Sequence, residues 1–168
     1  MDILDAQNPL ETVETILEAQ EWQFERLSED QILVEVSGQN GEYKLQLNWQ
    51  EKMSALQITV QTDICYSSYQ YTEAASIIAG INSKLWMGHF ELSAEQLSPT
   101  FRYTCFLRGL TSFNGSDYLA EIIEVALCES EKHHSELLNL LRSEDEKALH
   151  IYGEDHYNLA YLAAAGNA

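Results

Sequence analysis

Six segments of this chain alternate apolar and polar side chains with a period of two, the pattern of half-buried β-strands. The clearest is Tyr43–Trp49, in which aromatic residues and leucine fill every second position and polar residues fill the positions between them. Segments with one polar face form antiparallel sheets, because one side of the sheet can face water. The other five segments are Trp22–Phe24, Ile32–Val36, Leu56–Val60, Phe90–Leu92 and Phe101–Leu107.

Three further segments have apolar residues at helical spacing. The first follows Asn8-Pro9 and runs to about Ala19, the second is Tyr69–Leu85, and the third is a long helix of residues 116–141. We expect one or two short helices in residues 143–165. The order α-β-β-β-β-α-β-β-α predicts an α+β fold, an antiparallel sheet with helices on one face. Because no repeat or linker interrupts the chain, residues 1–168 are interpreted as a single domain.

Two turns are marked by glycine. Gly38-Gln-Asn-Gly41 predicts a hairpin turn, because glycine and asparagine accept a positive φ. Gly88 lies in INSKLWMGHFEL (residues 81–92), where the second helix gives way to a strand. We expect Gly88 in a conformation that a Cβ would disfavour, with Leu85 and Phe90 buried beside it.

The charge balance limits the partners. The chain has 9 Lys and Arg against 27 Asp and Glu, a formal charge of -18. Nucleic-acid binding depends on Lys and Arg contacts to phosphates, so no nucleic-acid partner is expected. An anionic lipid surface is disfavoured for the same reason, and no apolar run reaches the roughly 18 residues of a membrane span. Basic or apolar protein partners remain open.

Three cysteines, Cys65, Cys105 and Cys128, lie far apart without a C-x-x-C motif. Their odd number predicts free thiols and a reducing, cytoplasmic location. The acidic N-terminus lacks the pattern of a signal peptide. Cys105 alternates with apolar residues, so burial is expected.

No catalytic residue, cofactor site or metal site is predicted, because the nucleophile and phosphate-binding motifs are missing. Glu129 and His133 share a helix face, but two ligands are too few for a metal. His134 interrupts an apolar stripe and is expected at a helix interface.

A partner or dimer surface is the remaining candidate site. Trp22 and Trp49 are interpreted as core or rim. Trp86 is rotated about 100° from the stripe that Leu85 continues, so it belongs at the rim of the core or on a contact surface. His89 either contacts a partner or bonds a backbone carbonyl at the corner. The residues proposed for this surface are Trp86, Met87, His89, Ile77 and Leu137.

Four segments carry a resemblance to a known family: Asn8–Gly38, YKLQLNW (residues 43–49), INSKLWMGHFEL (81–92) and FRYTCFLRG (101–109). They resemble the YbjN family, a bacterial group described as sensory transduction regulators. The likeness covers a core of residues 8–141 and is loose in the tail, 142–168. It implies a fold similar to type III secretion chaperones, which are acidic dimeric proteins that hold an extended segment of a partner, and it carries over no catalytic motif.

We therefore expect no enzyme but a chaperone-like or regulatory adaptor of the bacterial cytoplasm. It would form a homodimer and bind an unknown protein segment. The dimer is expected through the long helix or its flanking strand edge. Two alternatives remain: a metal-dependent enzyme using the Glu129 and His133 region, and a structural subunit of a larger assembly.

Overall fold

The computed structural model describes residues 8–108 and 112–164, with side chains for 8–108 and 115–143. The chain divides into two compact units, with the boundary after Leu137. The first unit carries the sheet and the candidate site. Assignment of residues 1–168 to one domain stays a prediction.

The elements follow the expected order, and two short 3-10 helices, η1 and η2, are added to it. All six strands form one antiparallel sheet in the order β1-β2-β3-β4-β6-β5. The α+β fold class is therefore confirmed. The elements are α1 (Leu10–Ala19), β1 (Phe24–Ser28), β2 (Gln31–Ser37), β3 (Glu42–Gln50), η1 (Glu51–Met53), β4 (Ala55–Thr62), η2 (Ser68–Gln70), α2 (Tyr71–Asn82), β5 (His89–Glu91), β6 (Thr100–Phe106) and α3 (Ser112–Ala164).

The two faces of the sheet differ in chemistry, as the alternation predicts. Along one row Leu47 pairs with both Ile32 and Ile58, and all three side chains are 0% exposed. The adjacent row on the other face carries Gln46 and Thr59, which are paired and only half-buried. One face thus supplies the core, and the other faces water with amide and hydroxyl groups.

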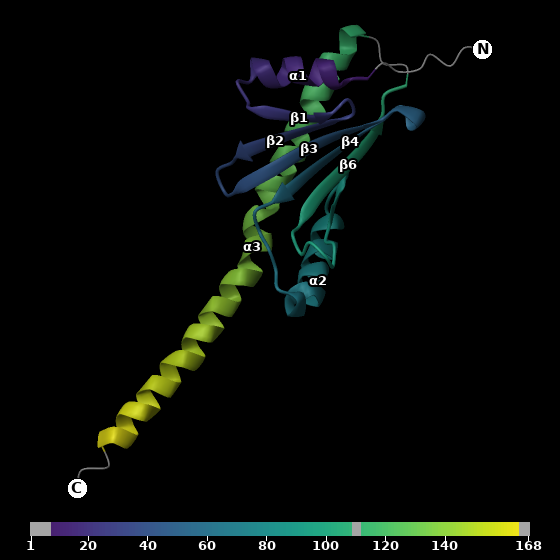
Figure 1. Cartoon of the computed structure of the whole chain (residues 1–168). Helices are drawn as coiled ribbons and strands as arrows, with labels where there is room; N and C mark the ends of the chain where they lie inside the picture. The colour runs from purple at the N-terminus through teal and green to yellow at the C-terminus, as the bar shows by residue number, and fades with distance from the viewer. Residues whose placement is uncertain (1–7, 109–111, 165–168) are drawn as a thin grey trace. The chain divides into compact units, whose positions relative to one another are not determined.

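Helices cover the apolar face of the sheet (Figure 1). α1 buries Leu10, Val13 and Leu17, and α2 packs against β5 and buries Ile78 and Ile81. The part of α3 before Leu137 also buries its apolar stripe, at Leu119, Ile122, Ile123 and Ala126. The arrangement of helices on one face is confirmed for the first unit.

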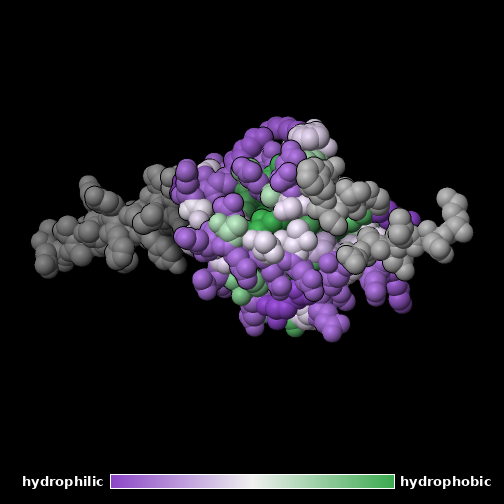
Figure 2. Space-filling model, turned by 90° about the horizontal axis from the view of Figure 1, so that it is seen from above, coloured by the Kyte–Doolittle hydropathy of each residue, from purple (hydrophilic) through white to green (hydrophobic). Residues whose placement is uncertain are grey.

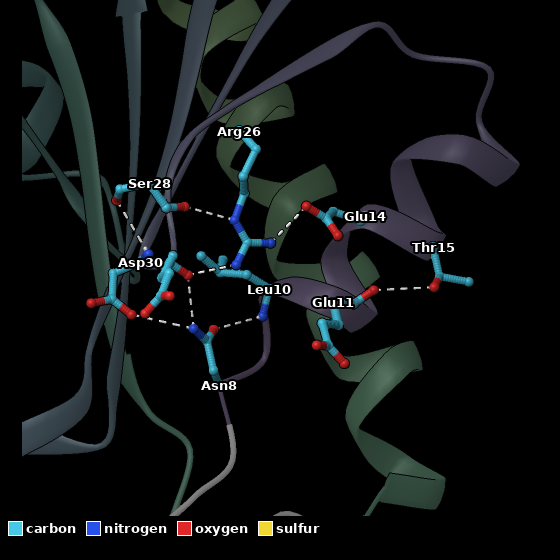
Figure 3. Close-up of polar contacts among 9 residues, drawn as sticks. Asn8, Leu10, Glu11, Glu14, Thr15, Arg26, Ser28 and Asp30 are labelled. Atoms are coloured by element: carbon cyan, nitrogen blue, oxygen red, sulfur yellow. Dashed lines mark hydrogen bonds and ion pairs between the residues drawn. The ribbon is translucent and has the colours of Figure 1, made fainter.

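Polar contacts fix α1 to the edge of the sheet (Figure 3). The Arg26 guanidinium donates to Glu14 of α1 at 2.6 Å and to the Ser28 carbonyl at 2.7 Å. The Asn8 side chain accepts from the Leu10 N–H at 3.0 Å and donates to the Glu29 carbonyl at 2.9 Å. The predicted Asn8-Pro9 helix start is confirmed, and these bonds hold α1 against β1.

The corner before β5 needs its glycine. Gly88 has a φ of +68°, and a Cβ there would lie 2.3 Å from the Phe101 ring. Phe90 is 2% exposed, and the Asn82 side chain bonds both its N–H and its carbonyl. Leu85 was expected to be buried but is only half-buried. The reason is that α2 ends at Asn82, so Leu85 lies on the turn and not on the helix stripe.

The C-terminal end of the long helix was predicted wrongly. The expected short helices after residue 143 do not form, and α3 continues from Ser112 to Ala164. Residues 144–149 are Glu, Asp, Glu, Lys, Ala and Leu, most of them strong helix formers, and no proline interrupts them.

Candidate protein-binding groove

A groove lies between α1 and α3, with the ends of β2 and β3 at its base. Its volume is about 660 Å³. Val36 and Tyr43 form the base, because they are paired residues on the apolar face of the sheet. The α1–α3 groove is lined by Ile16, Leu17, Gln20, Trp22, Val36, Gly38, Gln39, Tyr43, Ala120, Ile123, Glu124, Leu127, Cys128, Glu131 and Lys132.

Much of this lining is apolar and remains accessible. Ile16, Trp22, Val36 and Leu127 are half-buried, whereas core residues of the same types are fully covered. In the view from above in Figure 2, apolar residues gather in a central band that hydrophilic residues border. An apolar groove within a polar surface is typical of a ligand or protein interaction site.

The charges around the groove are mainly negative. Glu124 and Glu131 line it, and Glu18 of α1 is exposed directly after the lining residue Leu17. Lys132 is the cation among the described lining residues, and its ammonium lies 3.5 Å from the Glu129 carboxylate. The groove therefore combines an apolar base with an acidic rim.

The β2–β3 turn is held against α3 at one end of the groove. The Glu131 carboxylate accepts from the backbone N–H of Asn40, and the Asn40 side chain donates to the Glu131 carbonyl at 3.3 Å. The turn itself is confirmed by the Gly38 N–H, which donates to the Gly41 carbonyl at 2.9 Å.

The reason given for its glycines was wrong, because neither Gly38 nor Gly41 has a positive φ. They allow a close approach of neighbouring side chains instead. A Cβ at Gly38 would lie 2.0 Å from a Glu131 oxygen, and one at Gly41 would lie 2.2 Å from His134 Nε2. We call these contacts between the turn and α3, together with the pair formed by His134 of α3 and Asp63, the turn clamp.

His134 confirms its expected place at a helix interface. Its side chain is 3% exposed, and Nε2 lies 2.7 Å from Asp63 Oδ1. Burial alone would raise the pKa of Asp63, but hydrogen bonds from His134 and from the Glu42 N–H outweigh burial and hold that pKa below its usual value. The ring also packs edge-on against Tyr43, with centroids 5.7 Å apart.

Tyr43 joins the clamp to the groove. Its hydroxyl is buried and has no hydrogen-bond partner among the described residues. Burial raises the pKa of the Tyr43 phenol well above its usual range, and the nearby Glu131 carboxylate raises it further. Because Tyr43 lines the groove and contacts His134, loosening of the clamp would alter the base of the groove.

The three cysteines are free thiols, as predicted. Cys105 is buried, while Cys65 and Cys128 are exposed. Cys128 lines the α1–α3 groove and Cys65 does not. The chain therefore has one accessible thiol inside the groove and one outside it.

In the Glu129 and His133 region, one histidine lies between two carboxylates of the same helix. His133 Nε2 lies 3.5 Å from Glu129, and its Nδ1 lies 3.6 Å from Glu136. The ring is mostly buried and packs edge-on against Phe90, with centroids 5.9 Å apart. Within residues 8–108 and 115–143, three metal-ligating side chains do not come together in a geometry suited to a metal ion.

The five residues proposed from the sequence as a contact surface lie outside the described lining of the groove. Trp86 is 84% exposed, Met87 and Ile77 are half-buried, and His89 lies 3.8 Å from Glu91. Leu137 is 0% exposed, and its carbonyl accepts from the Tyr66 hydroxyl, so its side chain is not at the surface of this structure. A role for these residues in partner or dimer contact stays a prediction.

Sequence reasoning did not find the groove, although one signal pointed to it. The apolar stripe of α3 is wider than contact with a sheet requires, and its extra width is where Leu127 lies. Trp22 was interpreted as core or rim, and it lies half-buried in the lining. Trp49, interpreted in the same way, is buried in the core.

The fold defines a single-sheet α+β protein with one helix-covered face and an open apolar groove. The chain belongs to the YbjN family, described as "Putative bacterial sensory transduction regulator", whose model matches residues 9–127. A crystal structure of "YbjN, a putative transcription regulator from E. coli" is similar in fold, with a TM-score of 0.57 and 10% sequence identity. That match covers 84% of this chain and 97% of the E. coli chain. No curated protein sequence matches this chain.

Proposed function

We propose that this protein is a non-catalytic regulatory adaptor that holds a segment of a partner protein in the α1–α3 groove. The observation that carries the proposal is the half-buried apolar lining of Ile16, Trp22, Val36 and Leu127. Apolar side chains that a domain leaves accessible in a groove are a common basis of protein recognition. Membership of a family of regulators is consistent with this role.

A protein partner fits the charge better than nucleic acid does. The formal charge of -18 and the acidic rim of the groove would repel a phosphate backbone. Three free thiols favour action in the reducing cytoplasm. None of the described helices combines the length and apolarity that a membrane crossing requires.

Site-specific crosslinking tests the proposal. A photo-reactive amino acid placed at Cys128 is expected to form covalent adducts with another protein in the native cell, because that position lines the groove. The same amino acid at Cys65, which is equally an exposed cysteine position, is the matched control. A lack of adducts at position 128, or equal labelling from both positions, would remove the support for the groove.

A homodimer is a second proposal about the assembly. Because each chain carries a charge of -18, a dimer must be held by apolar contact, and salt should strengthen it by screening the repulsion. We expect a species of twice 19.1 kDa in light scattering, more stable at high salt and unaffected by chelator. A contact through the long helix or its flanking strand edge is favoured, and the 84% exposed Trp86 is the alternative. A monomer at high micromolar concentration would contradict the dimer.

A further inference from the structure

We infer that the occupant of the α1–α3 groove is an amphipathic helical segment of a partner protein, with Lys or Arg flanking its apolar face. The inference rests on the proposed function, because it names the class of segment that the groove would hold. Three observations carry it: the main-chain bonding at the base of the groove, the length of its α3 wall, and the charge of its rim.

The strands at the base of the groove cannot pair with a further strand from a partner protein. β2 is already paired on both sides, with β1 and with β3, and β3 is paired with β2 and with β4. Val36 and Tyr43 at the base belong to this ladder. An extended peptide would therefore find no free row of main-chain donors and acceptors there, and strand addition requires such a row. Recognition in the groove must use side chains, which is how a helix binds in a groove.

The α3 wall matches the length of a helical segment. Its lining residues are Ala120, Ile123, Glu124, Leu127, Cys128, Glu131 and Lys132, which recur every three or four positions. At 1.5 Å per residue this stripe is about 18 Å long, equal to a helix of about 12 residues. A regular stripe of that length favours a rod-shaped partner that presents apolar residues at the same spacing.

The acidic rim of the groove favours a partner segment with basic residues on either side of its apolar face. Glu124 is an exposed lining residue, and Glu18 and Glu121 are exposed on the two helices that wall the groove. Lys132 is engaged by Glu129, so it offsets little of this charge. Complementary charges at a rim raise the association rate and the specificity of a complex. The same rim would repel the equally acidic groove of a second copy, so a homodimer contact through α3 would have to lie outside the groove.

Protection of Cys128 from alkylation provides the test. In the full-length chain with Cys65→Ser, the rate at which a maleimide modifies Cys128 is measured with three synthetic peptides. The first is a basic amphipathic helix of leucine, alanine and lysine, the second has glutamate in place of lysine, and the third is the basic sequence broken by two prolines. We expect the first to slow alkylation at least about tenfold at saturation, and the other two to leave it unchanged.

The complementary chain with Cys128→Ser reports on Cys65, which should remain reactive toward the maleimide in the presence of every peptide, because Cys65 lies outside the groove.

Charge reversal on the protein gives a second control. Glu124→Lys and Glu73→Lys change the net charge equally, but Glu73 lies exposed on α2 and away from the groove. We expect Glu124→Lys to lower the affinity for the basic peptide roughly threefold to tenfold, and Glu73→Lys to change that affinity little.

Several results would overturn the inference. They are failure of the basic helix to protect Cys128, protection by the proline-broken peptide, and equal weakening by Glu124→Lys and Glu73→Lys, which would indicate unspecific charge attraction. Protection that grows with the concentration of the protein itself would show that a second copy occupies the groove. If crosslinks from position 128 persist while the basic helix gives no protection, the proposed function stands with another class of partner. If both fail, the groove is not a binding site.

Discussion

Gly88→Val is expected to lower the free energy of unfolding by about 2–4 kcal/mol, through backbone strain and overpacking. The φ of Gly88 is +68°, which a β-branched residue adopts at high cost, and a Cβ would lie 2.3 Å from the Phe101 ring and 3.0 Å from the Arg102 carbonyl. The backbone carbonyl cannot move away without disturbing the β5–β6 pairing. Denaturant unfolding followed by circular dichroism measures the change.

Gly80→Ala is the matched control, because a Cβ at Gly80 would meet nothing within 4 Å. Gly80 lies inside α2, where alanine is a better helix former, so this variant should be neutral or up to about 1 kcal/mol more stable. If Gly88→Val unfolds at the same denaturant concentration as the natural protein, the strain at this corner is not real.

His134→Ala is expected to lower the free energy of unfolding by about 2–4 kcal/mol, since it leaves a cavity and removes the bond to Asp63. The His134 side chain is 3% exposed and packs against Tyr43. Denaturant unfolding again gives the number, and unchanged stability would show that the clamp contributes nothing.

The acid side of the stability profile should depend on Asp63. The pKa of the Asp63 carboxyl is held below its ordinary value in the folded protein, so the stabilisation it provides is present above that ordinary value and is lost as the pH falls through the folded pKa. We expect Asp63→Asn to remove this part of the acid dependence below about pH 4. Asp117→Asn, an exposed change on α3, should leave it in place. Identical acid profiles for Asp63→Asn and the natural protein would contradict the prediction.

The alternation of apolar and polar residues predicted the strands well, because it arises from the geometry of each strand by itself. The alternation from Tyr43 to Trp49 reflects the pleat of a single strand with one buried face, and that face needs no knowledge of what covers it. The same reasoning placed Asn8 at the start of α1, because its side chain bonds within two residues. The sheet and the order of elements followed from such local signals.

The errors concern contacts between distant segments. Gly38 and Gly41 were attributed to turn conformation, while their actual constraint is the approach of Glu131 and His134 from α3. The α1–α3 groove was missed for the same reason: Trp22 belongs to it only because α3 lies opposite. No periodicity within one element carries that information.

The turn clamp also has a consequence for the order of folding. Asn40 and Glu131 are separated by 91 positions, and Asp63 and His134 by 71, whereas β1 to β4 pair through hairpins between neighbours. Closing such long loops costs chain entropy that hairpins avoid, so the meander can form before α3 docks. The clamp then contributes little to the rate-limiting barrier for folding, and its interactions act mainly by slowing unfolding. We therefore expect the α3 wall of the groove to dock after the meander has formed and to detach first when the protein unfolds.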